Sequence, residues 1–136
     1  MELFISVLGI ISAIITVALT NYYSKKNQLK FEERKLKEAH YINYINAISN
    51  NVISSNTEDS RNKFADCQNK LLLVGSADVV NKLMIFHDYI KPPRLENFSV
   101  EVHDQLLTDL IKAMRHDLFL SSKVNKKYPN IHLTGK

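Results

Sequence analysis

The pattern of hydrophobic and polar positions divides the chain into an uncharged N-terminal stretch and a longer region of amphipathic segments. Residues 3–20 (LFISVLGIISAIITVALT) carry no charged side chain, and Asn21, Tyr22 and Tyr23 extend the uncharged run to Ser24. A helix needs about 20 mostly apolar residues to cross the hydrocarbon of a bilayer. The pattern therefore predicts one transmembrane helix over residues 1–23.

The flanks of this stretch favour an anchor over its alternatives. A cleaved signal peptide has a basic start and a small-residue cleavage site, whereas this sequence starts with Met1 and Glu2 and has no A-x-A pattern. The only cysteine, Cys67, lies far downstream, which argues against a lipoprotein. A buried core helix is the remaining alternative, but soluble core helices are rarely this long without a charge.

Basic residues follow the span and set its expected orientation. Residues 24–37 contain six bases against Glu32 and Glu33, whereas Glu2 is the one charge before the span. Because Lys and Arg near a span favour the cytoplasmic side, we expect the N-terminus outside a bacterial inner membrane and the rest in the cytoplasm. Residues 24–40 are expected to continue the helix as a juxtamembrane basic helix or stalk, either a solvated linker or a short coiled coil.

Small residues recur along the span at spacings of three and four, which places them on one helix face. They are Ser6, Gly9, Ala13, Thr16 and Thr20. Small residues let membrane helices approach closely, so the stripe is a candidate surface for homo-oligomerisation. Chance is the alternative, since such residues are common in all spans, and the pattern leaves both open.

Beyond residue 40 the apolar positions recur at helical spacing in four segments. We expect helices over about residues 41–52, 57–74, 76–90 and 99–118. These form a cytoplasmic domain over residues 41–120, followed by a basic, frayed tail over residues 121–136. The expected fold is therefore all-α: one transmembrane helix followed by a small four-helix bundle.

Local signals predict where these helices begin and end. Thr57, Ser76 and Ser99 are placed to cap helix N-termini. Gly75 is expected to end the second of the four helices in a left-handed conformation, and Pro92 follows the third helix as a stop.

Composition and charge narrow the possible functions. The chain has 136 residues with 3 glycines and 3 prolines, which favours helices, and its single cysteine allows no internal disulfide. Residues 24–37 and 121–136 each carry a net charge of +4, whereas residues 38–120 carry eight bases and eleven acids. Because the domain itself is acidic, we do not expect it to bind DNA.

Catalytic and metal-binding motifs are not found in the sequence. The five histidines form neither an H-E-x-x-H nor an H-x-x-x-H pair, and the nucleophile-elbow and phosphate-loop patterns do not occur. Cys67 lies on an apolar helix face, where a small core residue is the simpler interpretation. We therefore expect no enzyme, no metal and no cofactor.

Two groups of residues are candidates for binding a phosphate-bearing ligand. Lys112, Arg115 and His116 lie close together on the fourth expected helix, and Ser76 starts the third. The alternative is structural, with Arg115 or Asp117 tying the two helices together through Asp78 or the Ser76 cap. The second group lies in the tail, where lipid headgroups are the alternative ligand; it consists of Lys123, Lys126 and Lys127.

Two stretches resemble a set of short bacterial proteins with N-terminal spans and a small helical domain. They are residues 71–80 (LLLVGSADVV) and residues 107–118 (LTDLIKAMRHDL). The layout is also similar to that of a membrane-bound accessory effector of type III CRISPR systems. That resemblance implies antiphage defence, with an oligomeric cytoplasmic domain that senses cyclic tetra-adenylate and acts through the membrane helix.

The implied partners are membrane lipid, further copies of the same chain and a cyclic oligonucleotide. A tetramer is favoured, because a ring of four phosphates could meet one cation per subunit. Two other functions remain open: a non-catalytic scaffold that recruits a protein partner to the membrane, and a small holin-like toxin.

Overall fold

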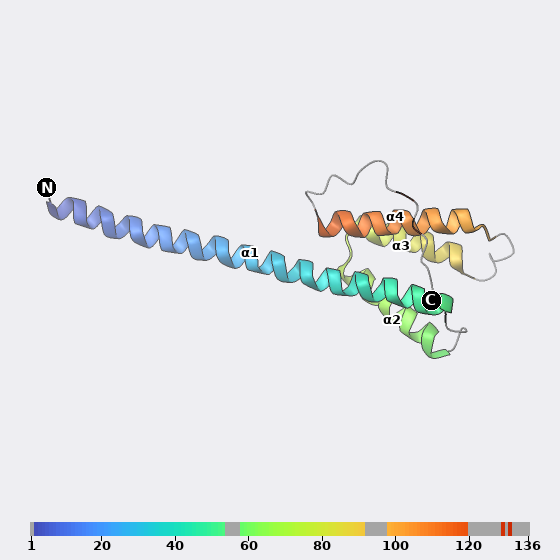
Figure 1. Cartoon of the computed structure of the whole chain (residues 1–136). Coiled ribbons are helices and arrows are strands. Elements are labelled where there is room, and N and C mark those ends of the chain that lie inside the picture. Colours follow the sequence, from blue (N-terminus) through green and yellow to red (C-terminus); the bar gives the residue numbers. More distant parts are fainter. Residues whose placement is uncertain (1, 54–57, 92–97, 120–128, 130, 132–136) are drawn as a thin grey trace. The chain divides into compact units, whose positions relative to one another are not determined.

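The computed structural model describes residues 2–53, 58–91, 98–119, 129 and 131, and within these ranges it contains four helices and no strand. The helices are α1 (Glu2–Ile53), α2 (Glu58–Val74), α3 (Ala77–Ile90) and α4 (Val100–Leu118), shown in Figure 1. The predicted all-α fold is confirmed. The expected cap at Thr57 and most of the basic tail lie outside the described residues.

The first helix runs without a break from the uncharged stretch into the region expected to form the first helix of the domain. The chain divides within α1 into two compact units, residues 1–35 and residues 36–136. In the first unit the apolar part of α1 has a mean hydropathy of 2.1 over an 18-residue window, and none of that window is buried. By length and composition, this helix is able to cross a membrane.

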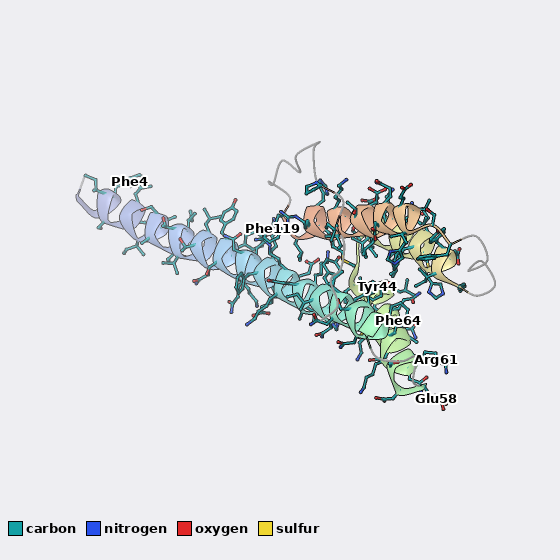
Figure 2. The ribbon with its side chains drawn as sticks, turned by 45° about the vertical axis from the view of Figure 1, so that its right-hand side comes forward. Phe4, Tyr44, Glu58, Arg61, Phe64 and Phe119 are labelled. Atoms are coloured by element: carbon teal, nitrogen blue, oxygen red, sulfur yellow. The ribbon has the colours of Figure 1, made fainter. Side chains whose placement is uncertain are left out.

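The second unit is built around a core to which all four helices contribute. Its largest fully buried side chains include Tyr44 of α1, Leu71 of α2, Phe86 of α3 and Leu107 of α4. The rings of Tyr44 and Phe64 lie 5.5 Å apart and join α1 to α2 (Figure 2). Helices α3 and α4 run antiparallel side by side (Figure 1). The end of α1 thus completes a four-helix unit with α2, α3 and α4, as the apolar pattern predicts.

The predicted N-terminal caps of the last two helices are confirmed. Ser76 adopts an extended conformation, and its hydroxyl accepts a hydrogen bond from the Val79 backbone N–H at 3.5 Å. Ser99 caps α4 in the same way, through the Val102 N–H. The backbone of Ser99 is also held by Tyr89, whose hydroxyl accepts from the Ser99 N–H at 2.8 Å and donates to the Ser99 carbonyl at 3.0 Å. This second contact joins the end of α3 to the start of α4.

Gly75 differs from its prediction. Its φ does not lie in the left-handed region, and its N–H donates to the Leu71 carbonyl at 2.9 Å, as in a continuing helical turn. The reason for glycine here is steric, because a Cβ would lie 2.9 Å from the Leu71 carbonyl oxygen and 3.2 Å from Val79 Cγ1. The absence of a side chain, rather than a special backbone conformation, lets α2 and α3 meet closely.

The C-terminal tail, which was expected to fray, touches the domain at one described position. The Ile131 N–H donates a hydrogen bond of 2.8 Å to the hydroxyl of Thr108, and that hydroxyl donates to the Asp104 carbonyl at 2.6 Å. Both Thr108 and Asp104 are buried on α4. At Ile131, therefore, the tail is bonded to α4 and satisfies a buried polar group.

Candidate functional site

A polar groove lies between α3 and α4. Its volume is about 290 Å³, and five of its six lining residues are titratable: Asp78 and Lys82 from α3, and Asp109, Lys112 and His116 from α4. The sixth is Ala113 of α4. The α3 residues are four positions apart, and the α4 residues are spaced by three and four, so each set shares one helix face. Two amphipathic helices that pack side by side therefore place these charged residues along a common seam.

The groove carries charges of both signs. Lys112 Nζ lies 3.8 Å from Asp109 Oδ1, and their side chains are 28% and 34% exposed. The other titratable members are Lys82, Asp78 and His116. Ammonium and imidazole groups bind phosphate oxygens, whereas carboxylates accept hydrogen bonds from amino and hydroxyl groups. The groove is thus suited to a ligand that presents phosphates and hydrogen-bond donors together.

The structure brings together only part of the predicted phosphate site. Lys112 and His116 line the groove, and Lys82, which the sequence pattern did not indicate as a binding residue, joins them from α3. Arg115 is exposed and is not one of the groove-lining residues, and Ser76 caps α3 instead of lining the groove. The three tail lysines lie outside the described residues. The four-residue spacing of Asp78 and Lys82 is the signal that would have revealed the α3 side.

A second polar cluster joins α1 to α4. The Tyr41 hydroxyl donates to Asp117 Oδ2, and Lys37 Nζ lies 3.3 Å from Asp117 Oδ1. Burial raises the pKa of the Tyr41 hydroxyl, the Asp117 carboxylate raises it further, and a hydrogen bond with the Ser76 backbone opposes both. Tyr41 therefore meets α4 and the α2–α3 junction at once. The structural alternative named Arg115 or Asp117 as a tie between α4 and α3; the Asp117 carboxylate bonds to Tyr41 and Lys37 of α1 instead.

Residues of the groove and residues of this cluster are neighbours in sequence, both on α4 and at the start of α3. His116 lines the groove and the next residue, Asp117, bonds to α1. On the other side, Asp78 lines the groove and lies two residues after Ser76, whose backbone meets Tyr41. A ligand that moves α3 against α4 would therefore act close to the residues that hold α1.

The remaining histidines of α3 and α4 lie at the opposite end of these helices from His116. Burial lowers the pKa of His87, and the positive charge of Lys91 lowers it further. The negative charge of Asp88 partly offsets this decrease. His103 Nδ1 lies 3.1 Å from Asp104 Oδ1, and its ring lies 5.3 Å from that of Phe86. Within the described ranges, no three histidine, cysteine or carboxylate side chains gather into a group that could hold a metal ion.

In the apolar part of α1, threonine hydroxyls of the small-residue face donate hydrogen bonds to carbonyl groups of their own helix. Thr16 donates to the Ser12 carbonyl at 2.7 Å, and Thr20 to the Thr16 carbonyl at 2.8 Å. A Cβ on Gly9 would meet no atom within 4 Å. Because these threonine protons are already bonded, both threonines suit an apolar environment without a partner helix. Association through Ser6, Gly9, Ala13, Thr16 and Thr20 stays a prediction.

In comparisons with known proteins, no family model, no curated protein and no solved structure matches this chain.

Proposed function

We propose that this chain is a membrane-anchored sensor of a phosphate-bearing nucleotide, with the α3–α4 groove as the binding site and the N-terminal part of α1 as the anchor. The observation that carries this proposal is the groove itself, whose lining combines Lys82, Lys112 and His116 with the carboxylates of Asp78 and Asp109. A ligand bearing only phosphates would be repelled by Asp78 and Asp109. A nucleotide can place its phosphates on the cations and its amino or hydroxyl groups on the carboxylates.

The ligand class follows from the resemblance stated above. A cyclic oligoadenylate has phosphates and exocyclic amino groups in repeated order, so several subunits could each bind one repeat. We propose a symmetric homo-oligomer, with four subunits for a cyclic tetra-adenylate, working in bacterial antiphage defence. The domain is oriented to the cytoplasm, in line with the basic residues that follow the span.

The route from groove to membrane would run through α1. Ligand can shift the protein only if it binds one arrangement of the helices better than another. In the proposed mechanism, the bound ligand contacts His116 and shifts α4. The next residue, Asp117, bonds to Tyr41 of α1. The unbroken helix from Tyr41 back to the apolar stretch is the element on which this change would act.

Calorimetry of the full-length protein in detergent with cyclic tetra-adenylate tests the proposal. We expect saturable binding that weakens at least about tenfold in the double variant Lys82→Ala/Lys112→Ala, because each charge-assisted phosphate contact contributes about 1.5–3 kcal/mol. The matched control is Lys63→Ala/Lys70→Ala, which removes two exposed α2 lysines and should leave affinity unchanged. Absence of binding to cyclic tetra-adenylate and to linear adenine nucleotides would overturn the proposal and favour the scaffold function.

A further inference from the structure

Three lysines follow the aromatic end of the apolar stretch on a continuous helix. Lys25, Lys26 and Lys30 are all exposed, and α1 continues through them without interruption. Tyr22, Lys26 and Lys30 are four residues apart and therefore share a helix face. Lys26 Nζ lies 6.0 Å from the centre of the Tyr22 ring, and the rings of Tyr22 and Tyr23 meet edge to face at 5.7 Å.

These lysines have no acidic partner in the described part of the chain. No carboxylate lies within ion-pair distance of them, unlike Lys63 and Lys70, which pair with acids one turn away. Residues 21–31 contain no acid, and the next ones are Glu32 and Glu33. Within the described residues, these three ammonium groups therefore carry no neutralising carboxylate and are open to an anion from the surroundings.

Helix geometry decides which bases can reach a bilayer surface. With a rise of about 1.5 Å per residue, Lys25 and Lys26 lie about 3 and 4.5 Å beyond Tyr23, and Lys30 about 10.5 Å beyond it. The headgroup layer extends about 5–8 Å on each side of the hydrocarbon. Lys25 and Lys26 thus lie at headgroup depth, and the flexible four-carbon stem of Lys30 can reach back to it.

We infer that Lys25, Lys26 and Lys30, together with the Tyr22 ring, form a binding site for anionic phospholipid headgroups. The ammonium groups bind lipid phosphates, while Tyr22 lies at the interface and holds Lys26 by a cation–π contact. The site selects lipids with a net negative charge over zwitterionic ones. This inference rests on the membrane anchor in the proposed function and is independent of the groove.

The test uses the full-length protein reconstituted in phosphatidylcholine vesicles that contain phosphatidylglycerol. Electron paramagnetic resonance of spin-labelled lipids measures the association of each lipid with the protein. We expect a preference for phosphatidylglycerol that falls at least about fivefold in Lys25→Ala/Lys26→Ala/Lys30→Ala, since each base near an anionic surface contributes about fivefold. Alanine keeps the helix, because it has the highest helix propensity.

The control variant Lys63→Ala/Lys70→Ala/Lys91→Ala removes the same charge from exposed positions of the domain and should keep the preference. Inorganic phosphate at matched ionic strength should not displace the lipid; displacement would identify a general anion site and overturn lipid selectivity. Equal association of both lipids with the wild type would also overturn the inference. Sedimentation of the vesicles distinguishes these outcomes from loss of the anchor, because a protein without a membrane anchor would stay in the supernatant. Binding to the groove is measured separately, by calorimetry without vesicles.

Discussion

The hydroxyl of Tyr41 on α1 donates a hydrogen bond to the carboxylate of Asp117 on α4, across 76 residues of sequence. Lys37, one turn before Tyr41, contacts the other oxygen of the same carboxylate at 3.3 Å. Asp117 is thus held by two donors from one helix, and Tyr41 also contacts the Ser76 backbone. These contacts fix where the last turns of α1 lie on the α3–α4 pair.

Replacing Tyr41 by Phe removes a donor to a carboxylate and leaves Asp117 short of one partner. Hydrogen bonds to charged groups contribute about 1.5–3 kcal/mol, so Tyr41→Phe should lower the melting temperature of the domain by at least about 5 °C. Circular dichroism of the full-length protein in detergent measures this change. Tyr22→Phe, at an exposed position of the first unit, is the matched control and should leave the melting temperature unchanged. Equal melting temperatures for wild type and Tyr41→Phe would show that the contact does not stabilise the fold.

Tyr44 presents the opposite case, because its hydroxyl is buried and has no hydrogen-bond partner among the described residues. An unsatisfied buried polar group costs about 1–3 kcal/mol. Tyr44→Phe keeps the ring that packs on Phe64 and should therefore raise the midpoint of urea unfolding. Tyr44→Ala removes the ring and should cost about 3–5 kcal/mol. A Tyr44→Phe variant less stable than the wild type would indicate that the hydroxyl has a partner in solution.

Stability should fall as the pH rises above 10, the ordinary pKa of tyrosine. Burial raises the pKa of both Tyr41 and Tyr44, and the Asp117 carboxylate raises that of Tyr41 further. Above pH 10, both hydroxyls therefore stay protonated in the folded domain, whereas tyrosines of the unfolded chain lose their protons. The folded state then binds more protons, and the free energy of unfolding decreases with increasing pH. Urea unfolding between neutral pH and pH 11 measures this decrease. Tyr41→Phe/Tyr44→Phe should flatten the alkaline part of the profile, and an unchanged slope in this variant would contradict the assignment.

Gly75→Ala should destabilise the domain, because the added Cβ would approach the Leu71 carbonyl oxygen to 2.9 Å. Backbone atoms cannot move aside as a flexible side chain can, and overpacking of this kind costs about 1–3 kcal/mol. Gly9→Ala introduces the same methyl group where no atom lies within 4 Å and serves as the control. Thermal unfolding of both variants should show a lower melting temperature for Gly75→Ala alone. Equal effects of the two substitutions would contradict the steric role of Gly75.

Local sequence determined most of the helical architecture. The uncharged run over residues 3–20 defines a helix able to span a membrane, and the hydroxyls of Ser76 and Ser99 mark the starts of α3 and α4. Apolar residues recur at helical spacing over residues 99–118, and Leu107 and Leu110 of this segment are fully buried. These features depend on contacts within one or two helical turns, so the order of residues is enough to reveal them.

Only the tertiary structure decided which polar residues meet. Lys82 joins Lys112 and His116 because α3 and α4 pack antiparallel, and Asp117 bonds to α1 instead of α3 because α4 presents it to Tyr41. The steric role of Gly75 likewise depends on Val79 and the Leu71 carbonyl, not on its own backbone angles. Such contacts join separate helices or depend on how closely two helices approach. Helical periodicity predicts each helix, but it does not determine how the polar face of one helix aligns with that of its neighbour.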